Sequence, residues 1–498
     1  GSSYTAGGLS GVANNAGSGA NPGNTADPVR NGAGQGGGGG AGGQGGANGA
    51  NGAVFIAYGS GTEVSKNVSW AEFNSATGEV QSANPGSGTC AGWCSSNDYS
   101  LPSERSNFSL VAYSGYLYAI GGVDASGSRT NTVYIAKIGA NGEPRLWHPT
   151  DTNPDNWVYW YQDANITSVR SDFTATAYNN RLYLIGGRSS SGPVSTVEIA
   201  DITPTGKLGA WSASTALPSN VYGHGAAIYN DRIYVLGGSN SIGGAPSNTV
   251  RYNKINTDGT LNNWVQTTNL PQGRFTGGGT MAAIWGAYIY VSSGCSTVNG
   301  SGYCTGVHSN IQLASINADG SLDAWNTVGT AVDERLGGNL LSWRGHLYRV
   351  GGCSSQNAST GDCGAATLDL IRVGKINRDG DASTVGESFA SGSGDCTGGN
   401  PSQCNLPGTT YVGNMLTNSF IYNGHLYITG GCTNNACSST SNDVVYAAID
   451  TNGSMTRPAT CNGSYVGGSW CYLANVLPSG VAASSPVTFG GYVYLVGG

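Results

Sequence analysis

Twelve cysteines carry the clearest chemistry in this 498-residue sequence. They fall in six sequential couples whose members lie four to ten positions apart: Cys90 and Cys94, Cys295 and Cys304, Cys353 and Cys363, Cys396 and Cys404, Cys432 and Cys437, and Cys461 and Cys471. A zinc site would need CxxC pairs or histidines at ligand spacing, and no couple is CxxC. The spacing therefore predicts six local disulfides, no metal site, and a secreted or cell-surface protein in an oxidising compartment.

The histidines are too few and too scattered to predict a catalytic site. There are five: His148, His224, His308, His346 and His425. His346 and His425 each open the same tripeptide "HLY", so they are positions of a repeat. The sequence leaves a Ser-His-Asp arrangement open, but no motif marks a nucleophile. We therefore predict no catalytic residues and no cofactor.

Composition narrows the class of partner. The net charge is −7 and only 10% of the residues are charged. Nucleic-acid binding needs a basic face, so this balance argues against it. No run of 18 apolar residues occurs, which predicts no membrane-spanning helix. The sequence does not begin with Met, so we expect a processed chain or a piece of a longer one.

A repeated segment supplies the elements that must position these residues. It ends in a glycine pair, as in "YLYAIGG" or "HLYITGG", and occurs in seven copies spaced 51 to 79 residues apart. Each copy has a Tyr three positions before the first residue of the pair: Tyr118, Tyr183, Tyr234, Tyr290, Tyr348, Tyr427 and Tyr494. Tight turns such as "YNNR" and "YNGH" precede several copies, which predicts a hairpin of two buried strands.

Two further strands complete each unit. A third strand follows the glycine pair, as in "NTVYIAKI" at 131–138, and then a turn that carries Asp-Gly, Asn-Gly or Thr-Gly. A Trp falls five positions after the turn glycine in four copies: Trp147, Trp211, Trp264 and Trp325. Units of four short antiparallel strands at this period stack radially as the blades of a propeller.

The glycine pair, the apolar strand after it and the Trp near the last turn resemble kelch repeats, over roughly residues 60–498. The pattern departs from the family where Ser293 replaces a glycine and where Trp is missing after Gly78, Gly380 and Gly453. The resemblance implies an all-β fold, a seven-bladed kelch-like β-propeller of four-stranded antiparallel blades.

Counting the repeats predicts how the ring closes. The seven turn glycines begin with Gly78, which precedes every glycine pair, whereas the last pair ends the chain. The amino end should therefore supply the two outer strands of one blade (about 67–85), and the carboxyl end its two inner strands (about 483–498). This arrangement leaves no open sheet edge. An alternative is that "AVFIAYGS" at 53–60 belongs to an eighth, incomplete blade.

The cysteine couples fall at two places in the unit. Three couples, at 295/304, 353/363 and 432/437, follow a glycine pair and should staple the loop that leaves the ring. The other three, at 90/94, 396/404 and 461/471, should staple the connection into the next blade.

Four arginines are candidate ligand-binding residues: Arg105, Arg170, Arg274 and Arg335. Each precedes the first strand of a blade, a position that in kelch propellers opens on the mouth of the central channel. Arginine there would suit carboxylate or sulfate groups through bidentate hydrogen bonds. The alternative is that these arginines bond the backbone of adjacent blades.

The insertion "NWVYWYQDAN" at 156–165 is rich in aromatic residues. Exposed Trp157, Tyr159, Trp160 and Tyr161 would make a surface that stacks on sugars or contacts a protein. At strand spacing, half of them would instead belong to the core beneath an outer strand.

Residues 1–53 form a separate segment, and residues 54–498 the propeller domain. The tract "NGAGQGGGGGAGGQGGANGANGA" cannot build a hydrophobic core, and a flexible linker is the default interpretation. Its composition resembles the glycine-rich segments of bacterial surface and fibre proteins. If the tract packs as extended polyglycine, another subunit would supply its backbone partners most easily. We therefore expect a stalk or assembly segment that mediates self-association.

These observations predict a non-enzymatic extracellular or cell-surface protein for adhesion, ligand binding or assembly of a surface appendage, with a glycan or a protein as possible ligand. The copper-radical oxidases built on kelch propellers need two histidines, two tyrosines and a cysteine in one site, and no such cluster is visible. The faint aspartate-box pattern in "TDGTLNNW" is explained by the kelch-type turn. The alternative is a secreted carbohydrate-active enzyme on a propeller scaffold.

Overall fold

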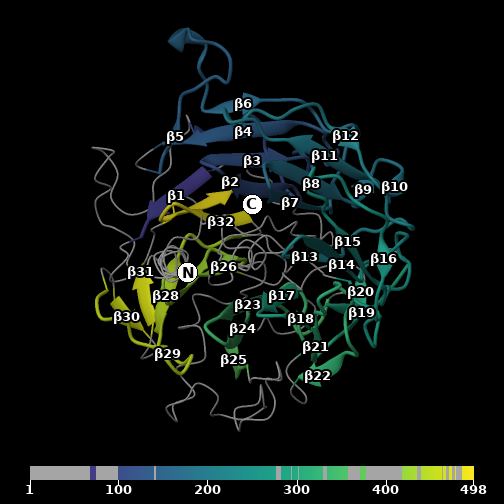
Figure 1. Cartoon of the computed structure of the whole chain (residues 1–498). Helices are drawn as coiled ribbons and strands as arrows, with labels where there is room; N and C mark the ends of the chain where they lie inside the picture. The colour runs from purple at the N-terminus through teal and green to yellow at the C-terminus, as the bar shows by residue number, and fades with distance from the viewer. Residues whose placement is uncertain are drawn as a thin grey trace, which may run out of the picture.

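The computed structural model describes residues 68–73, 99–139, 142–275, 282–292, 294–300, 302–328, 334–356, 371–376, 418–433, 439–461, 464–466, 470–473, 477, 480 and 485–497. Within these ranges seven antiparallel sheets surround a central axis, so the predicted seven-bladed β-propeller is confirmed (Figure 1). No helix in the described ranges is long and apolar enough to cross a membrane. The glycine-rich segment 1–53 and the strand considered at 53–60 lie outside these ranges.

The blades are numbered here in the order of their innermost strands. The first blade contains β2 (Ser109–Tyr113), β3 (Tyr116–Ile120), β4 (Val133–Ile138), β5 (Pro144–Arg145) and β6 (Trp160–Gln162), with a short 3-10 helix at Pro154–Asn156. The second contains β7 (Thr174–Tyr178), β8 (Arg181–Ile185), β11 (Val197–Asp201) and β12 (Ser212–Ala213), with a small hairpin of β9 (Arg188–Ser189) and β10 (Gly192–Pro193). The third contains β13 (Gly225–Tyr229), β14 (Arg232–Leu236), β15 (Val250–Lys254) and β16 (Val265–Gln266).

The remaining blades follow the same plan. The fourth contains β17 (Ala282–Trp285), β18 (Tyr288–Ser292), β21 (Ile311–Ser315) and β22 (Asn326–Val328), with the hairpin of β19 (Cys295–Val298) and β20 (Cys304–Val307). The fifth contains β23 (Asn339–Trp343), β24 (His346–Val350) and β25 (Ile371–Lys375). The sixth contains β26 (Asn418–Tyr422), β27 (His425–Thr429), β28 (Val444–Ile449), β29 (Met455–Thr456), β30 (Ser464–Val466) and β31 (Trp470–Leu473). The seventh contains β32 (Ser485–Phe489), β33 (Tyr492–Val496) and β1 (Val68–Glu72).

Both ends of the chain build the seventh blade, as the count of repeats predicted. Strand β1 pairs antiparallel with β33, with Val68 opposite Val496 and Glu72 opposite Tyr492. Strand β33 pairs in turn with β32. The second outer strand expected for this blade lies outside the described residues. Since β32 also lies beside β2 of the first blade, the ring is closed (Figure 1).

The core lies between neighbouring blades. Strands such as β3 and β33 are buried along their whole length, because each is covered by a blade on either face. This explains why the second strand of each repeat is an almost continuous apolar run. Seven clusters of buried apolar side chains result, each shared by two adjacent blades.

A hydrogen bond that recurs from blade to blade explains the repeated Tyr and turn glycine. The hydroxyl of the repeat tyrosine donates to the carbonyl of the turn glycine in the next blade, at 2.7 to 3.0 Å: Tyr118 to Gly206, Tyr183 to Gly259, Tyr234 to Gly320, Tyr348 to Gly453 and Tyr494 to Gly142. Gly206 has φ +78°, and a Cβ there would lie 2.4 Å from the Tyr116 ring. Only glycine therefore fits at this contact.

The glycine pair marks a close approach of two backbone segments. Gly122 has φ +98°, and a Cβ on it would lie 2.6 Å from both the Ser106 carbonyl oxygen and Phe108 Cβ. The residue after the pair forms a β-bridge with the segment that enters the blade, as Val123 does with Ser106. Cys295 and Cys353 occupy this position, and their bridges are to Phe275 and Leu336. The cysteine behind the glycine pair is thus fixed by backbone pairing at the point where the loop leaves the ring.

Two of the predicted disulfides, Cys295–Cys304 and Cys461–Cys471, are confirmed. The first joins β19 to β20 in the loop after a glycine pair, as expected. The second was predicted to staple a connection, but Cys471 lies in the outer strand β31 of its own blade. Cys353 and Cys432 are also disulfide-bonded, and the described part of the chain has no free cysteine. Their predicted partners Cys363 and Cys437, and the couples Cys90/Cys94 and Cys396/Cys404, lie outside it.

Candidate functional site

One end of the ring gathers most of the polar and charged side chains that the sequence singled out. We call it the loop face and define it by the residues after the glycine pairs together with those that enter each first strand. These residues are 103–108, 121–132, 168–173, 186–196, 219–224, 237–249, 272–275, 294–300, 302–310, 334–338, 351–356, 430–433 and 439–443.

The four predicted arginines lie on this face, but their side chains are buried, with 0–1% exposed. Three donate from Nη1 to the carbonyl of the first glycine of the pair in their own blade: Arg105 to Gly121 (2.7 Å), Arg170 to Gly186 (3.3 Å) and Arg335 to Gly351 (2.9 Å). The fourth, Arg274, donates to the side chain and carbonyl of Asn310. The guanidinium groups therefore tie the first strand of a blade to its second and third.

The backbone of the same arginines links neighbouring blades. The carbonyl of Arg170 accepts from the Gly122 amide at 2.8 Å, and that of Arg274 accepts from the Gly238 amide at 2.7 Å. The contact with adjacent blades that the sequence suggested thus runs through the main chain, whereas the guanidinium hydrogen bonds described above lie within each blade. Ligand binding by these four residues stays a prediction.

A buried ion pair joins the arginine of the second blade to its third strand. Arg170 Nη2 lies 2.6 Å from Glu198 Oε1, and the two side chains are 1% and 2% exposed. The second carboxylate oxygen of Glu198 accepts from the Thr167 amide at 2.8 Å. Because both charges are removed from water, loss of either partner would leave an uncompensated buried charge and destabilise the fold.

A second group of charges lies beside the entry to the second blade, and sequence reasoning missed it. Asp172, 2% exposed, accepts from the Ser171 hydroxyl at 2.7 Å and from Asn107 Nδ2 at 3.3 Å. Arg188 Nη1 lies 3.8 Å from Asp172 Oδ2, and Arg129 Nε donates to Ser171 Oγ at 2.8 Å. Arg188 therefore lies beside the Asp172 carboxylate, and Arg129 is linked to it through the Ser171 hydroxyl. We call these five residues the Asp172 cluster.

The electrostatics of the Asp172 cluster follow from its burial. Burial raises the pKa of the Asp172 carboxyl, although Arg188 and the Ser171 hydroxyl act in the opposite direction. Burial also lowers the pKa of Arg129, and the like charge of Arg188 adds to that effect. The Arg188 guanidinium lies 5.2 Å from the centre of the Tyr222 ring. The cluster is a partly buried cationic patch with an aromatic wall.

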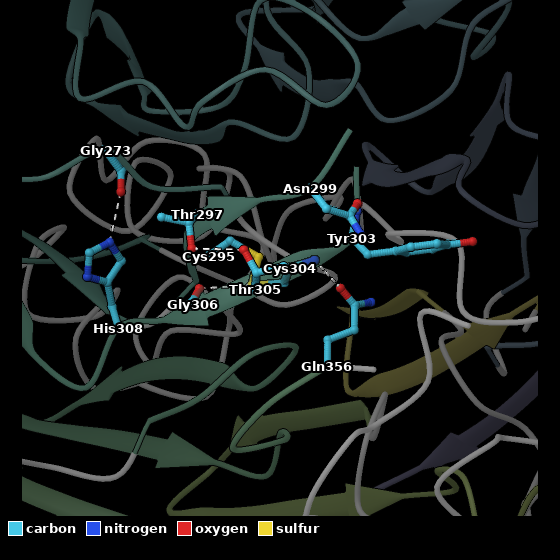
Figure 2. The surroundings of a disulfide bond; sticks show 10 residues. All are labelled: Gly273, Cys295, Thr297, Asn299, Tyr303, Cys304, Thr305, Gly306, His308 and Gln356. Carbon is cyan, nitrogen blue, oxygen red and sulfur yellow. Dashed lines mark hydrogen bonds between the residues drawn. A yellow bond between two sulfur atoms is a disulfide. The ribbon is translucent and has the colours of Figure 1, made fainter. Parts of the chain in front are cut away.

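A disulfide joins the two strands of the hairpin β19–β20 (Figure 2). Cys295 and Cys304 are buried against Tyr222, Phe275 and Leu336. The Cys304 amide donates to the Gln356 side-chain oxygen at 2.5 Å, which ties the hairpin to the next blade. The hairpin is therefore a rigid projection of the loop face.

An open hollow of about 480 Å³ lies beside the hairpin and is lined by Gln272, Gly273, Ser296, Val307, His308, Ser309 and Asn310. His308 Nε2 lies 2.8 Å from the Gly273 carbonyl oxygen (Figure 2). Burial, and then the charge of Arg274, lower the pKa of His308 to about 4. The imidazole is therefore neutral near pH 7 and donates from Nε2 to that carbonyl.

The predicted aromatic surface is partly core. Trp160 lies in the outer strand β6 and is 5% exposed, and its indole donates to the Tyr99 carbonyl at 2.7 Å. Tyr159 and Tyr161 are half-buried against the blade, and the Trp157 indole donates to the Asp151 carbonyl at 3.0 Å. A ligand contact by these residues stays a prediction.

The histidines lie in different blades and do not form one site, as the repeat positions of His346 and His425 suggested. His346 covers the turn glycine Gly453 of the next blade, at the position where Tyr116 covers Gly206. His224 is buried against the second blade, with Nε2 3.0 Å from Thr174 Oγ1. In the ranges that the structure describes, no three His, Cys, Asp or Glu side chains are grouped to hold a metal ion.

The comparisons with known proteins agree with this architecture. The family model "Kelch motif" matches residues 104–135 and 170–199. Kelch-like protein 36 of Rattus norvegicus is 24% identical over 262 residues, which cover 52% of this chain and 38% of that protein. Kelch repeat protein M-T8 of Myxoma virus is 24% identical over 201 residues, or 40% of this chain and 33% of that protein.

Among solved structures, "Structure of YjhT" aligns with a TM-score of 0.46 at 15% identity and covers 71% of this chain and 97% of that one. The chain matches well under two thirds of the length of the curated relatives named above. This chain is therefore a seven-bladed β-propeller that carries kelch motifs at residues 104–135 and 170–199 and is similar to kelch-like proteins.

Proposed function

We propose that this propeller is a non-enzymatic binding protein that presents its loop face to a partner. The observation that carries the proposal is the Asp172 cluster, where Arg188 lies beside a buried carboxylate and Arg129 is linked to it through Ser171. Tyr222, beside Arg188, packs against the disulfide of the hairpin β19–β20. Arginine next to an aromatic wall is typical of the centre of protein interfaces. Kelch-type propellers are scaffolds for such contacts.

A binding role suits the described groups better than catalysis does. Hydrolysis of a glycoside needs two carboxyl groups on either side of the bond, and the Asp172 cluster holds one. That carboxylate already accepts hydrogen bonds from Ser171 and Asn107. We therefore keep a glycan or a protein as the ligand class and do not favour a carbohydrate-active enzyme.

We further propose an extracellular or cell-surface location, with adhesion or construction of a surface appendage as the role. The two disulfides support an oxidising compartment. Self-association through residues 1–53 is part of this proposal. Light scattering of the full chain and of a chain that starts at Ser60 tests it: the full chain should assemble, and the shorter one should stay a folded monomer. Two monomers would contradict the assembly role.

The binding proposal is tested by substitution on the loop face. Arg188→Ser should weaken binding to a glycan array or to a panel of secreted proteins by about tenfold or more, because it removes a partly buried cation from the interface. Lys254→Ser is the matched control, since Lys254 lies at the far end of β15 and is 51% exposed. The proposal would be contradicted if both variants lost binding equally, or if the unaltered chain bound nothing on the array or in the panel.

A further inference from the structure

The repeat arginine occupies the same polar slot in the first two blades. Arg105 donates to the Gly121 carbonyl, to Ser103 Oγ at 3.3 Å and to Thr132. Arg170 donates to the Gly186 carbonyl, to Ser168 Oγ at 3.3 Å and to Thr196 Oγ1 at 2.6 Å. The slot therefore consists of a serine two residues before the arginine, the first glycine of the pair, and the threonine before the third strand.

The third blade keeps the slot but not the arginine. Val221 stands at the arginine position, because its carbonyl accepts from Gly187 as that of Arg170 accepts from Gly122. The three slot residues are retained as Ser219, Gly237 and Thr249. They line a cavity of about 280 Å³ together with Leu217, Asn220, Val221, Val235, Ser239, Asn240, Ala245, Ser247 and Arg251. The absence of one long side chain thus coincides with a polar cavity.

The charge beside the slot is reversed in this blade. Arg251 lies two residues after Thr249, just as Glu198 lies two residues after Thr196. In the second blade that glutamate pairs with Arg170, whereas the cavity of the third blade is lined by no carboxylate. The Arg251 guanidinium forms no ion pair or hydrogen bond with the residues that the structure describes, while its backbone pairs with Val235 and Gln266. Burial lowers the pKa of its guanidinium.

We propose that this cavity binds a carboxylate, which pairs with the Arg251 guanidinium and accepts hydrogen bonds from the hydroxyls of Ser219 and Thr249. The inference rests on the proposed binding function and names the chemistry of one site on the loop face. An added cation would be repelled by Arg251, whereas an anion supplies the partner that Glu198 supplies to Arg170 in the second blade.

The cavity also limits the size of the ligand. A volume of about 280 Å³ is at the lower end for ligand pockets, so it admits a small acid or one acidic side chain of a protein. The Gly237 carbonyl, whose counterparts Gly121 and Gly186 accept from arginine, is an acceptor for a hydroxyl or amide group next to the bound carboxylate.

Titration of the intact chain with four probes tests the proposal and separates the two sources of carboxylate. The probes are acetate, chloride, the blocked peptide acetyl-Gly-Glu-Gly-amide and its neutral counterpart acetyl-Gly-Gln-Gly-amide, with binding followed by calorimetry and by amide NMR shifts of residues 219–251. Acetate and the Glu peptide should bind in this cavity, and chloride and the Gln peptide should bind at least about tenfold more weakly. Tighter binding of the Glu peptide than of acetate identifies an acidic side chain as the source, and the reverse identifies a free acid.

Variants then assign the site. Arg251→Gln should weaken carboxylate binding by about tenfold to a hundredfold, the loss expected for a charge-assisted hydrogen bond. Lys254→Gln is the charge-matched control on the same strand and should leave the affinity within about twofold. The double variant V221R/R251E recreates the Arg170–Glu198 pair, and it should fill the cavity and abolish binding while the chain stays folded.

Three outcomes would overturn the carboxylate site: equal binding of the Glu and Gln peptides, unchanged affinity in Arg251→Gln, or binding that survives in the folded double variant. None of these three outcomes would contradict partner binding by the loop face, which is tested separately with Arg188→Ser.

Discussion

The hydroxyl of Tyr494 donates a 2.7 Å hydrogen bond to the carbonyl oxygen of Gly142, which lies 352 residues earlier in the chain. The bond is fully buried and joins the seventh blade to the first. The same bond joins Tyr183 of the second blade to Gly259 of the third. The contact that closes the ring is therefore chemically equivalent to the contacts within it.

Tyr494→Phe removes this bond without removing the ring. It leaves the Gly142 carbonyl without its donor in a buried place, which should lower the free energy of unfolding by about 1–3 kcal/mol. Tyr183→Phe should have an effect of similar size, because its bond differs by 0.2 Å in length and is also buried. Chemical denaturation of both variants measures this. If Tyr494→Phe left the free energy of unfolding unchanged while Tyr183→Phe lowered it, the contact that closes the ring would differ from the internal ones.

The turn glycines allow the backbone cost to be separated from the steric cost. Gly206 and Gly127 have nearly the same conformation, φ +78° and φ +80°. A Cβ on Gly206 would meet the Tyr116 ring at 2.4 Å, whereas a Cβ on Gly127 has no neighbour within 4 Å. Gly127→Ala should cost about 1–2 kcal/mol for the left-handed backbone alone. Gly206→Ala should lower stability further, because the new Cβ must displace the Tyr116 ring. Equal losses of unfolding free energy in the two variants, measured by thermal or chemical unfolding, would contradict the close contact.

Two ion pairs of different burial should respond differently to loss of charge. Glu198→Gln leaves the buried Arg170 guanidinium without its carboxylate and should destabilise the chain by about 3–5 kcal/mol. Asp201→Asn breaks the ion pair between Arg181 and the Asp201 carboxylate, which is 65% exposed, and should change stability by at most about 1 kcal/mol. Unfolding curves of the two variants give the comparison. If Glu198→Gln lowered stability only slightly, the hydrogen bonds from the Arg170 guanidinium to Gly186, Thr196 and Ser168 would be enough to stabilise it.

The sequence predicted most of the fold because the structural unit is repeated. The positions of Tyr118 and Gly206 recur at fixed places in the repeat. Because the first turn glycine precedes every glycine pair and the last pair ends the sequence, the repeats also predicted that β1 lies beside β33. It could not predict that these two repeat positions bond each other, because the partner lies in the next blade, 88 residues away. Periodicity locates a residue within its unit, but it does not say which neighbouring unit the side chain reaches.

The candidate site was harder to predict than the fold. The position of Arg170 was recognised, but the direction of its side chain depends on Thr196 and Glu198, which lie in another strand. The Asp172 cluster was missed because its members come from separate loops. Aligning "ERSNFSL" with "VRSDFTA" places Asn107 and Asp172 at one position, and this alignment is the signal that would have drawn attention to them. The cavity beside Arg251 has the same kind of signal, Val221 at an arginine position.

His224 makes the stability of the ring depend on pH. The side chain is 1% exposed, and burial lowers its pKa from 6.5 to about 4. Below pH 6.5 the unfolded chain therefore binds a proton that the folded chain does not. The free energy of unfolding should fall as the pH drops from about 6.5 towards 4, by up to about 1.4 kcal/mol per pH unit from this residue. Above pH 6.5 His224 should contribute no slope, because it is then neutral in both states.

The comparison with His224→Gln isolates this effect, because glutamine is polar but does not titrate in this range. The variant should lose stability less steeply than the unaltered chain between pH 6.5 and 4. Asp172, whose folded pKa is raised by burial, changes stability in the opposite sense, but it is present in both chains and cancels in the difference. Parallel curves of unfolding free energy against pH for the two proteins would show that His224 is protonated at the same pH in the folded and unfolded chain, and hence that its imidazole is not held neutral by burial against Thr174.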